Sequence, residues 1–334
     1  IEFQVKEDGS VDLKRSLANP GPFLLNYIIT KQVCAEIKII KGYRPDVVVS
    51  DTRASSIIAS RLLGIPVICI LNQFNIIIPR KKRFLRLSKL ADHGSIAILA
   101  KIWASSDKVL IPDFPEPYTL SEGNLNIPSV YRKKIRFTGP ILPFYPDELP
   151  SKECLREEMG IGIEKKLVFA PISGPKKERY HLIKMLTKAF KDFSDEYRIV
   201  MSMGEPEHSN MLLSDGKISI YGWIEDRFKY LKACDVIVAR AGHETLVHSI
   251  SYGKPIILVP TPNHTEQLVN AKKAFDLGFA LVLDQSKIDA KTLLNSVERA
   301  MNSCVNSKVR EMSSMARRFN GVKAILEEIM RYAN

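Results

Sequence analysis

Residues 240–245 combine residue types that can bind a phosphate group. Arg240 supplies a fixed positive charge, and Gly242 has no side chain to keep a phosphate away from the backbone. The residues from Glu244 to Tyr252 read as a helix that begins directly after this glycine. The free N–H groups and the dipole at a helix N-terminus favour an anion. The spacing therefore predicts an anion-binding loop.

A second polar loop follows about 20 residues later. Thr261–His264 comes after a predicted apolar strand, 255–260, and before a predicted helix, 265–277. It leads into Glu266, whose carboxylate accepts hydrogen bonds, and Gln267, whose amide both donates and accepts. Such a pair suits the hydroxyl groups of a sugar. One site could therefore hold a diphosphate and a sugar side by side.

The elements around the two loops predict how they are positioned. Residues 235–239 form a short β-branched apolar run, which is typical of a buried parallel strand. Gly253 and Pro255 end the first helix, and Gly278 ends the second. The order strand, loop, helix, repeated twice, is that of a doubly wound sheet, with both loops at carboxyl ends of strands.

The ordered set Arg240-Ala241-Gly242, Thr245, Gly253-x-Pro255 and Glu266-Gln267 before Asn270-Ala271 resembles the donor half of GT-B glycosyltransferases. The nearest type is the MurG-like UDP-GlcNAc transferases and their relatives that build lipid-linked glycans. The resemblance implies an α/β fold with two Rossmann-like, doubly wound parallel-sheet domains facing a cleft. It implies an inverting transfer of a sugar, expected to be GlcNAc, from a UDP-sugar to a polyprenyl-linked, dolichyl-linked or other lipid acceptor. No cofactor and no metal are expected, because a DxD motif is absent from the sequence.

The resemblance also implies roles for individual residues. The donor diphosphate is expected to contact Ser173, Gly174, Arg240, Ala241, Gly242, His243 and Thr245. The uracil and ribose are expected at Trp223, Ile224, Glu244 and His248, and the donor sugar at Asn263, Glu266 and Gln267. The chain departs from the family at His248, where related transferases carry a ribose-binding Glu. For Ser173-Gly174, Trp223 and His243, a plain turn, a core contact and a structural role respectively remain open alternatives.

The length of 334 residues predicts about two domains. We expect an acceptor-side domain over 1–140, a Pro-rich linker over 141–150, a nucleotide-sugar domain over 151–315, and a final helix over 316–334 that crosses back to the first domain. In the first domain, Asp51, Asn72 and Gln73 follow predicted strands at 45–50 and 67–71, and we expect them on the acceptor side. Turn and cap chemistry is the alternative for these three residues.

The net charge of +12 points to an anionic partner. Residues 76–90 concentrate this charge in a basic amphipathic segment with Arg80, Lys81, Lys82, Arg83, Phe84 and Arg86. Such a segment can lie on an anionic membrane, and the alternative is a solvated helix face. No nucleic-acid motif accompanies it. Without an apolar run of 18 residues, the sequence predicts a cytoplasmic protein that binds peripherally to the inner face of the cell membrane.

The catalytic base is not predicted. GT-B families carry a Gly-rich loop, often with a catalytic His, near the start, and residues from Ile1 onward do not match it. We expect that the first one or two βα units are missing from the numbered chain and would supply the base; a short variant is the alternative. Two other functions stay open: a UDP-GlcNAc 2-epimerase on the same fold, and a non-catalytic nucleotide-sugar-binding or membrane-scaffolding subunit.

Overall fold

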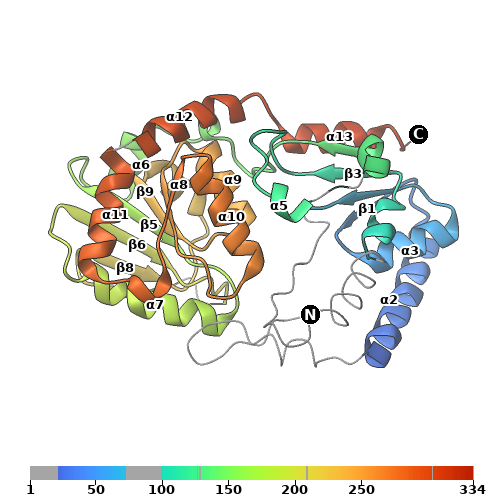
Figure 1. Cartoon of the computed structure of the whole chain (residues 1–334), viewed down its shortest axis with the longest axis horizontal. Helices are drawn as coiled ribbons and strands as arrows, with labels where there is room; N and C mark the ends of the chain where they lie inside the picture. The colour runs from blue at the N-terminus through green and yellow to red at the C-terminus, as the bar shows by residue number, and fades with distance from the viewer. Residues whose placement is uncertain are drawn as a thin grey trace. The chain divides into compact units, whose positions relative to one another are not determined.

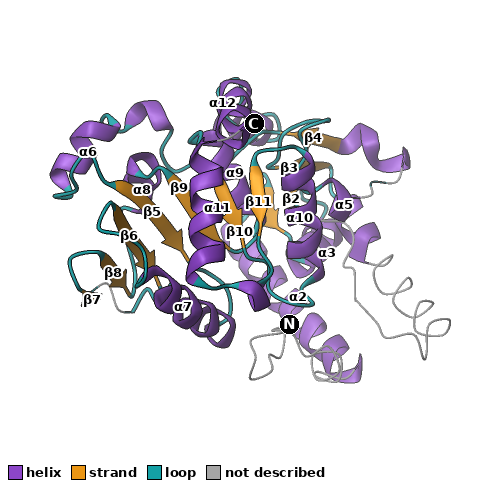
Figure 2. Cartoon of the chain, turned by 60° about the vertical axis from the view of Figure 1, so that its left-hand side comes forward, coloured by secondary structure: helices purple, strands orange, loops and turns teal. Residues whose placement is uncertain are grey.

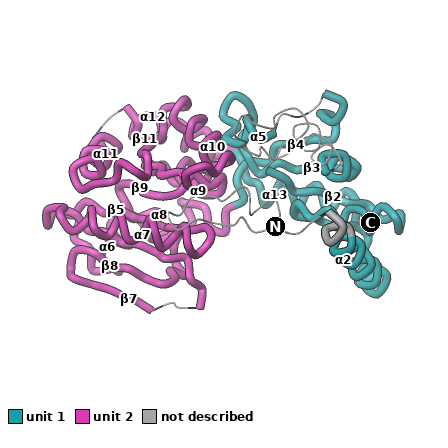
Figure 3. The backbone as a smooth tube through the Cα atoms, turned by 60° about the horizontal axis from the view of Figure 1, so that its bottom comes forward, with its two compact units in different colours: residues 1–4, 12–141, 319–334 teal, residues 5–11, 142–318 magenta. Residues whose placement is uncertain are grey.

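A computed structural model describes residues 22–72, 99–125, 127, 129–207, 210–302 and 304–333, with side chains from Tyr27 onward (Figure 1). These residues form two compact units, shown in different colours in Figure 3. Unit 1 runs to Ile141 and resumes at Phe319, whereas unit 2 comprises Leu142–Arg318. Gln73 and the predicted membrane segment at 76–90 lie outside the described residues.

Unit 1 contains a parallel sheet with the strand order β1-β2-β3-β4. Its strands are β1 (Val48–Asp51), β2 (Val67–Ile70), β3 (Lys108–Ile111) and β4 (Ile135–Phe137). Its helices are α2 (Pro22–Tyr43), α3 (Ala54–Leu63), a helical stretch at 99–104, α5 (Glu122–Leu125), the 3₁₀ helix η2 (Ser129–Lys134) and α13 (Gly321–Met330).

Both faces of this sheet are buried, because alternate strand residues point to opposite sides. Cys69 and Val109 pack with Ile57 of α3 on one face. Ile68 and Leu110 pack with Ile325 of α13 on the other face. The C-terminal helix is thus part of the core of unit 1, although it is far from the strands in sequence.

Unit 2 contains a seven-stranded sheet with the order β11-β10-β9-β5-β6-β8-β7 among the described residues. The strands are β5 (Lys166–Pro171), β6 (Tyr197–Ser202), β7 (Met211–Ser214), β8 (Ile218–Tyr221), β9 (Val236–Ala239), β10 (Ile256–Leu258) and β11 (Ala280–Val282). Only β7, at one edge, pairs antiparallel.

The helices of unit 2 connect and cover these strands. They are α6 (Lys152–Glu158), α7 (Lys176–Phe190), α8 (Arg227–Ala233), α9 (His243–Ser251), α10 (Thr265–Asp276), α11 (Ala290–Asn302) and α12 (Cys304–Ala316), with the 3₁₀ helices η3 (Pro146–Glu148) and η4 (Gln285–Lys287). Figure 2 shows α7 and α11 on one face of the sheet, where Leu182, Leu186 and Val297 enter the core with alternate residues of β5 and β9. On the other face, Phe169 of β5 stacks on Tyr230 of α8 at 5.7 Å between ring centroids.

The strand order of unit 2 marks a place for a ligand. From the central strand β5 the chain first adds β6 and β8 on one side, and then returns to add β9, β10 and β11 on the other side. The loops that follow β5 and β9 therefore leave the sheet in opposite directions and open a crevice at their carboxyl ends. Doubly wound sheets bind ligands at this topological switch point.

Candidate functional site: a pocket at the switch point of unit 2

The crevice contains a partly open cavity of about 110 Å³ at the carboxyl ends of β5, β6 and β8. The side chains of α8 and α9 close it on the remaining sides. Its lining comprises Phe169, Pro171, Ile172, Ser173, Ser202, Gly204, Trp223, Ile224, Arg227, Phe228, Leu231, Ile237, Glu244, Thr245 and His248. An apolar floor with a few polar groups at the rim is the usual composition of a small-molecule site.

The four residues predicted to hold a base and a ribose all line this one cavity. Trp223 and Ile224 come from the loop between β8 and α8, whereas Glu244 and His248 lie one turn apart on α9. Trp223 is half-buried, so part of its flat ring remains accessible to a ligand. The fold thus brings together residues that are 20 or more positions apart in sequence.

His248 is an uncharged member of the pocket. Burial lowers its pKa to about 4, and the carboxylate of Glu244, 3.8 Å away, only partly opposes that effect. The edge of its ring meets the ring of Phe228 at 5.2 Å between centroids. At neutral pH the imidazole therefore offers one N–H donor and one nitrogen acceptor, which are the groups needed to bind a hydroxyl.

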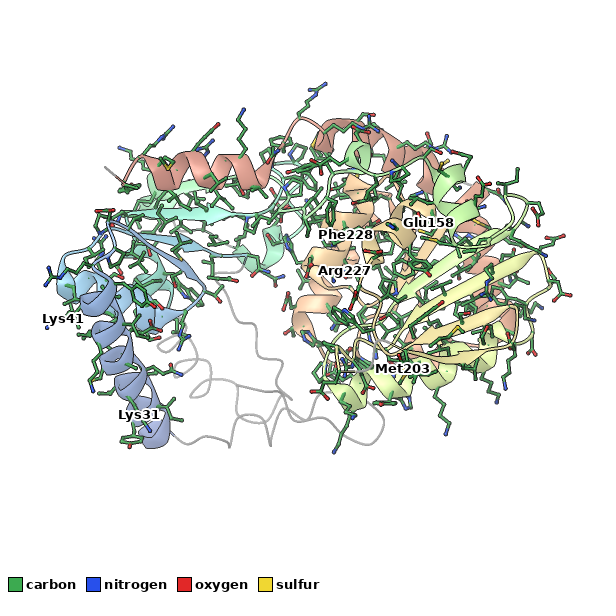
Figure 4. All side chains as sticks on the ribbon, turned by 180° about the vertical axis from the view of Figure 1, so that it is seen from behind. Lys31, Lys41, Glu158, Met203, Arg227 and Phe228 are labelled. Atoms are coloured by element: carbon green, nitrogen blue, oxygen red, sulfur yellow. The ribbon has the colours of Figure 1, made fainter. Side chains whose placement is uncertain are left out.

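Arg227 is a pocket residue that the sequence analysis missed. Its Nη2 donates to Glu244 Oε1 at 2.7 Å, and its guanidinium lies 4.9 Å from the centroid of the Phe228 ring. Figure 4 labels both residues on α8. No motif marks this arginine. The only available signal was its position four residues after Trp223.

Two helices begin at the switch point without a side-chain cap. α7 starts after Pro175 and α9 starts after Gly242, and neither N-cap side chain accepts a hydrogen bond from its helix. By contrast, α10 is capped by His264, whose Nδ1 accepts from Gln267 N. Uncapped helix N-termini at the mouth of a pocket favour an anionic ligand.

The predicted glycine loops are open. A Cβ atom at Gly242 would meet only Thr245 Oγ1, at 3.9 Å, and the backbone there has an ordinary extended conformation with φ of −72°. Ser173 and Gly174 are exposed, and a Cβ atom at Gly174 would meet nothing within 4 Å. The fold itself does not fill these spaces, which leaves the backbone within reach of a ligand.

The side chain of Arg240 is buried and hydrogen-bonded to the protein. Only 3% of it is exposed, and its guanidinium donates from Nη1 to Val259 O at 2.9 Å and to Gln285 Oε1 at 2.7 Å. Its Nη2 donates to Glu178 O at 3.1 Å, and burial lowers its pKa to about 10, so the side chain remains a cation. Its terminal nitrogens thus connect the loops that surround the site, and the predicted contact of Arg240 with the diphosphate stays a prediction.

The other predicted phosphate residues lie in the same loop in different environments. Thr245 is half-buried and lines the cavity. The side chain of Ala241 is fully buried, and its carbonyl accepts from Asn270 Nδ2 at 3.2 Å. His243 is 8% exposed. A ligand could therefore reach Ala241 and His243 mainly through the backbone.

The predicted sugar residues lie together around the start of α10. Asn263 is exposed and adopts a left-handed backbone conformation with φ of 65°. Glu266 is half-buried, and its carboxylate makes no hydrogen bond or ion pair with any described residue. Gln267 accepts from Thr261 N through Oε1 at 2.8 Å.

In unit 1, the described acceptor-side residues occupy neighbouring strand ends. Asp51 is the last residue of β1 and is exposed, and Asn72 follows the adjacent parallel strand β2 and is half-buried. Their roles stay predictions. Within the described ranges, no helix is long and apolar enough to span a bilayer.

The chain is similar to known glycosyltransferases. Residues 178–329 match the glycosyltransferase family 28 C-terminal domain. An uncharacterized glycosyltransferase of Methanosarcina mazei is 28% identical over 298 residues, covering 89% of this chain and 76% of that protein. The UDP-N-acetylglucosamine--N-acetylmuramyl-(pentapeptide) pyrophosphoryl-undecaprenol N-acetylglucosamine transferase of Limosilactobacillus fermentum is 23% identical over 289 residues, covering 83% of this chain and 70% of that protein.

Solved structures share the fold. The glycosyltransferase of kitacinnamycin superposes with a TM-score of 0.66 at 16% identity, covering 91% of this chain and 80% of the other. Acinetobacter baumannii MurG superposes with a TM-score of 0.56 at 18% identity, covering 92% and 80% of the two chains.

Proposed function

Since the chain is a glycosyltransferase of the GT-B superfamily with a family 28 C-terminal domain, we propose that it transfers GlcNAc from UDP-GlcNAc to a lipid-linked acceptor. The observation that carries the proposal is the pocket at the switch point. Trp223, Glu244 and His248 line it, and the uncapped N-termini of α7 and α9 begin beside it. These features match, in turn, a flat base, a ribose and a diphosphate.

The proposed reaction follows from this arrangement. A hydroxyl group of the acceptor attacks the anomeric carbon of GlcNAc, the bond from that carbon to the UDP oxygen breaks, and the configuration inverts. The leaving diphosphate gains negative charge, which the N–H groups and dipoles of α7 and α9 stabilise. The acceptor hydroxyl gives its proton to a base, to which no described residue is assigned.

One relative supports UDP-GlcNAc as donor and a lipid pyrophosphate as acceptor. The relative from Limosilactobacillus fermentum is named for both, and the match covers most of either chain. An epimerase is not favoured, because the relatives reported above are named glycosyltransferases. A purely non-catalytic subunit is not favoured for the same reason.

A membrane surface as partner is supported by one described helix. Tyr27, Lys31, Cys34, Lys38 and Lys41 recur at helical spacing on α2, and all five are exposed; Figure 4 labels Lys31 and Lys41 near opposite ends of that helix. The acid in the described part of α2, Glu36, pairs with Arg53 at 3.0 Å. A basic face with an aromatic residue is suited to anionic lipid, in addition to the predicted segment at 76–90.

The transfer assay tests the proposal. The protein is incubated with UDP-GlcNAc and a short-chain polyprenyl pyrophosphate acceptor that carries a sugar with a free hydroxyl, and both UDP and glycosylated lipid are measured. Equal amounts of the two products are expected. UDP binding without turnover would support a binding subunit, and release of free ManNAc would support an epimerase; either result would overturn the proposal.

Vesicle flotation tests the membrane partner. Lys38→Glu/Lys41→Glu on α2 is compared with the matched change Lys184→Glu/Lys188→Glu on the exposed face of α7. Each basic residue near an anionic surface contributes about 1 kcal/mol, so the α2 variant should lose most binding to vesicles that contain phosphatidylglycerol. Equal flotation of both variants and the wild type would contradict the role of α2.

A further inference from the structure

A chain of buried polar groups connects the ends of several strands beneath the site. Glu178 lies in the first turn of α7 and is 2% exposed, and Thr261 follows β10 and is fully buried. Thr261 Oγ1 donates to Glu178 Oε2 at 2.9 Å. Burying a carboxyl group is costly unless it is hydrogen-bonded, so this contact strongly favours one position of the Thr261 loop.

This series of hydrogen bonds continues to Gln267, which we expect to contact the sugar. The backbone N–H of Thr261 donates to Gln267 Oε1 at 2.8 Å. Because only an oxygen of the amide can accept this hydrogen bond, Oε1 must face Thr261, and Nε2 must face the other way. Nε2 makes no hydrogen bond with the described part of the chain. The N–H donors of Gln267 therefore point away from Thr261 and are available to a ligand.

The same buried groups hold the phosphate loop. The backbone carbonyl of Glu178 accepts from Arg240 Nη2, and Arg240 in turn reaches Gln285 of η4. In this way the segments that follow β5, β9, β10 and β11 share one network. One oxygen of the carboxyl group, Glu178 Oε1, is buried without a hydrogen-bond partner among the described residues. A fold that needed only stability would not favour such a group at this position.

We propose that Glu178 and Thr261 are positioning residues of the donor site, which fix the amide of Gln267 as a hydrogen-bond donor to the transferred sugar. The acceptors on the sugar would be hydroxyl oxygens or the carbonyl oxygen of an acetamido group. Glu266, next to Gln267, would supply the complementary acceptor for sugar hydroxyls. Glu178 and Thr261 are buried, whereas Gln267 is only half-buried, so both act through Gln267.

This inference rests on the proposed function, and its test separates the two. Dissociation constants for UDP and for UDP-GlcNAc are measured by calorimetry in the full chain, together with the melting temperature. The variants are Thr261→Val, which keeps the shape but removes the hydroxyl group, and Thr261→Ser, which keeps the hydroxyl group. Glu178→Gln retains an oxygen acceptor and serves as a second conservative change.

We expect Thr261→Val to weaken UDP-GlcNAc about tenfold and UDP less than twofold. Thr261→Ser and Glu178→Gln should stay within about twofold of the wild type for both ligands. In a Gln267→Ala background, Thr261→Val should add almost nothing, because the group that it positions is already absent. A role confined to stability would lower the melting temperature without this selectivity.

Three results would overturn the inference while leaving the function intact. They are equal weakening of UDP and UDP-GlcNAc by Thr261→Val, additive effects of Thr261→Val and Gln267→Ala, and a wild type that binds UDP-GlcNAc no more tightly than UDP. Failure of a folded wild type to bind UDP at all would instead overturn the proposed function, and the inference with it.

Discussion

The two edges of the unit 2 sheet differ in how completely their polar groups are paired. At the amino edge, Asp235 accepts from Lys152, from Arg156 Nη2 at 2.5 Å and from Leu167 N at 2.7 Å. Arg156 also donates to three backbone carbonyls, and Lys254 donates to two. At the carboxyl edge, the carboxylate of Glu266 and the amide nitrogen of Gln267 have no described partner, and two helices begin uncapped.

The difference separates structural charge from functional charge. The paired groups at the amino edge hold β5, α6 and the start of β9 together. At the carboxyl edge, α7 and α9 begin uncapped beside the cavity at the switch point, and Glu266 and Gln267 lie in the first turn of α10. Polar groups that have no partner within the fold can be hydrogen-bonded by a ligand instead. Charge alone does not reveal a site, whereas uncapped helix N-termini beside a cavity do.

The largest expected effect comes from filling the space at Gly242. Gly242→Val places carbon atoms where the diphosphate is expected, while φ of −72° suits any L-residue. We predict a loss of about a thousandfold in kcat/KM for UDP-GlcNAc with an unchanged melting temperature. Gly42→Ala, where an added Cβ meets nothing within 4 Å, is the control and should keep full activity. Full activity of the Gly242→Val variant would contradict a phosphate site at the carboxyl edge.

A matched pair of acid-to-amide changes tests the two edges directly. Burial raises the pKa of Asp235, but the hydrogen bond and charge of Lys152 outweigh it and hold that pKa below its ordinary value. Asp235→Asn should therefore lower the free energy of unfolding by about 3 kcal/mol and leave activity per folded molecule intact. Glu266→Gln should lower the activity per folded molecule and leave the free energy of unfolding unchanged. Urea titration and the transfer assay measure both; similar results for the two variants would refute the comparison.

The pH dependence of stability reports on His248. Its pKa is about 6.5 in the unfolded chain and about 4 in the folded protein, because burial disfavours the charged form. The unfolded state then binds more protons between these values, so stability is full above pH 6.5 and falls as the pH drops toward 4. We predict that His248 accounts for about 2 kcal/mol of lost stability at pH 5 relative to pH 8. Unfolding of His248→Gln at both pH values should show a correspondingly smaller loss.

The smallest loss of affinity is expected at Trp223, where we expect the uracil ring to stack. Trp223→Ala should weaken UDP by about 1 to 2 kcal/mol, roughly tenfold, since it removes a stacking surface. It should weaken UDP-GlcNAc by the same factor, unlike Thr261→Val. Calorimetry with both ligands provides the check, and Trp223→Phe, which retains a ring, should recover most of the affinity. A selective loss for UDP-GlcNAc alone would place Trp223 at the sugar instead.

Much of the fold could be predicted because the sequence changes character at each boundary. The apolar β-branched run before Arg240 became β9, and Gly253 with Pro255 ended α9 within a residue of the predicted position. The short strands β7 and β11 were missed. β11 has three residues, too few to show the alternation of apolar and polar residues that marks a strand. β7 lies at the edge of the sheet and pairs with β8.

The candidate site was predicted less evenly, for a physical reason. Trp223 and His248 were placed through spacing along helices and loops, which the local sequence encodes. The direction of the Arg240 side chain depends on Glu178, Val259 and Gln285, which are distant in sequence, so no local pattern could show that it points inward. Arg227 was missed because its partner Glu244 is brought near only by the packing of α8 and α9.

Binding of UDP to the full chain, followed through tryptophan emission and by calorimetry, tests the central claim most directly. The chain has two tryptophans, and Trp103 is buried in the core of unit 1 while Trp223 lines the cavity. We predict a saturable change in emission that disappears in Trp223→Phe and is accompanied by heat in the wild type but not in Gly242→Val. Folded wild-type protein that shows neither signal with UDP would contradict a nucleotide site at the carboxyl edge of unit 2.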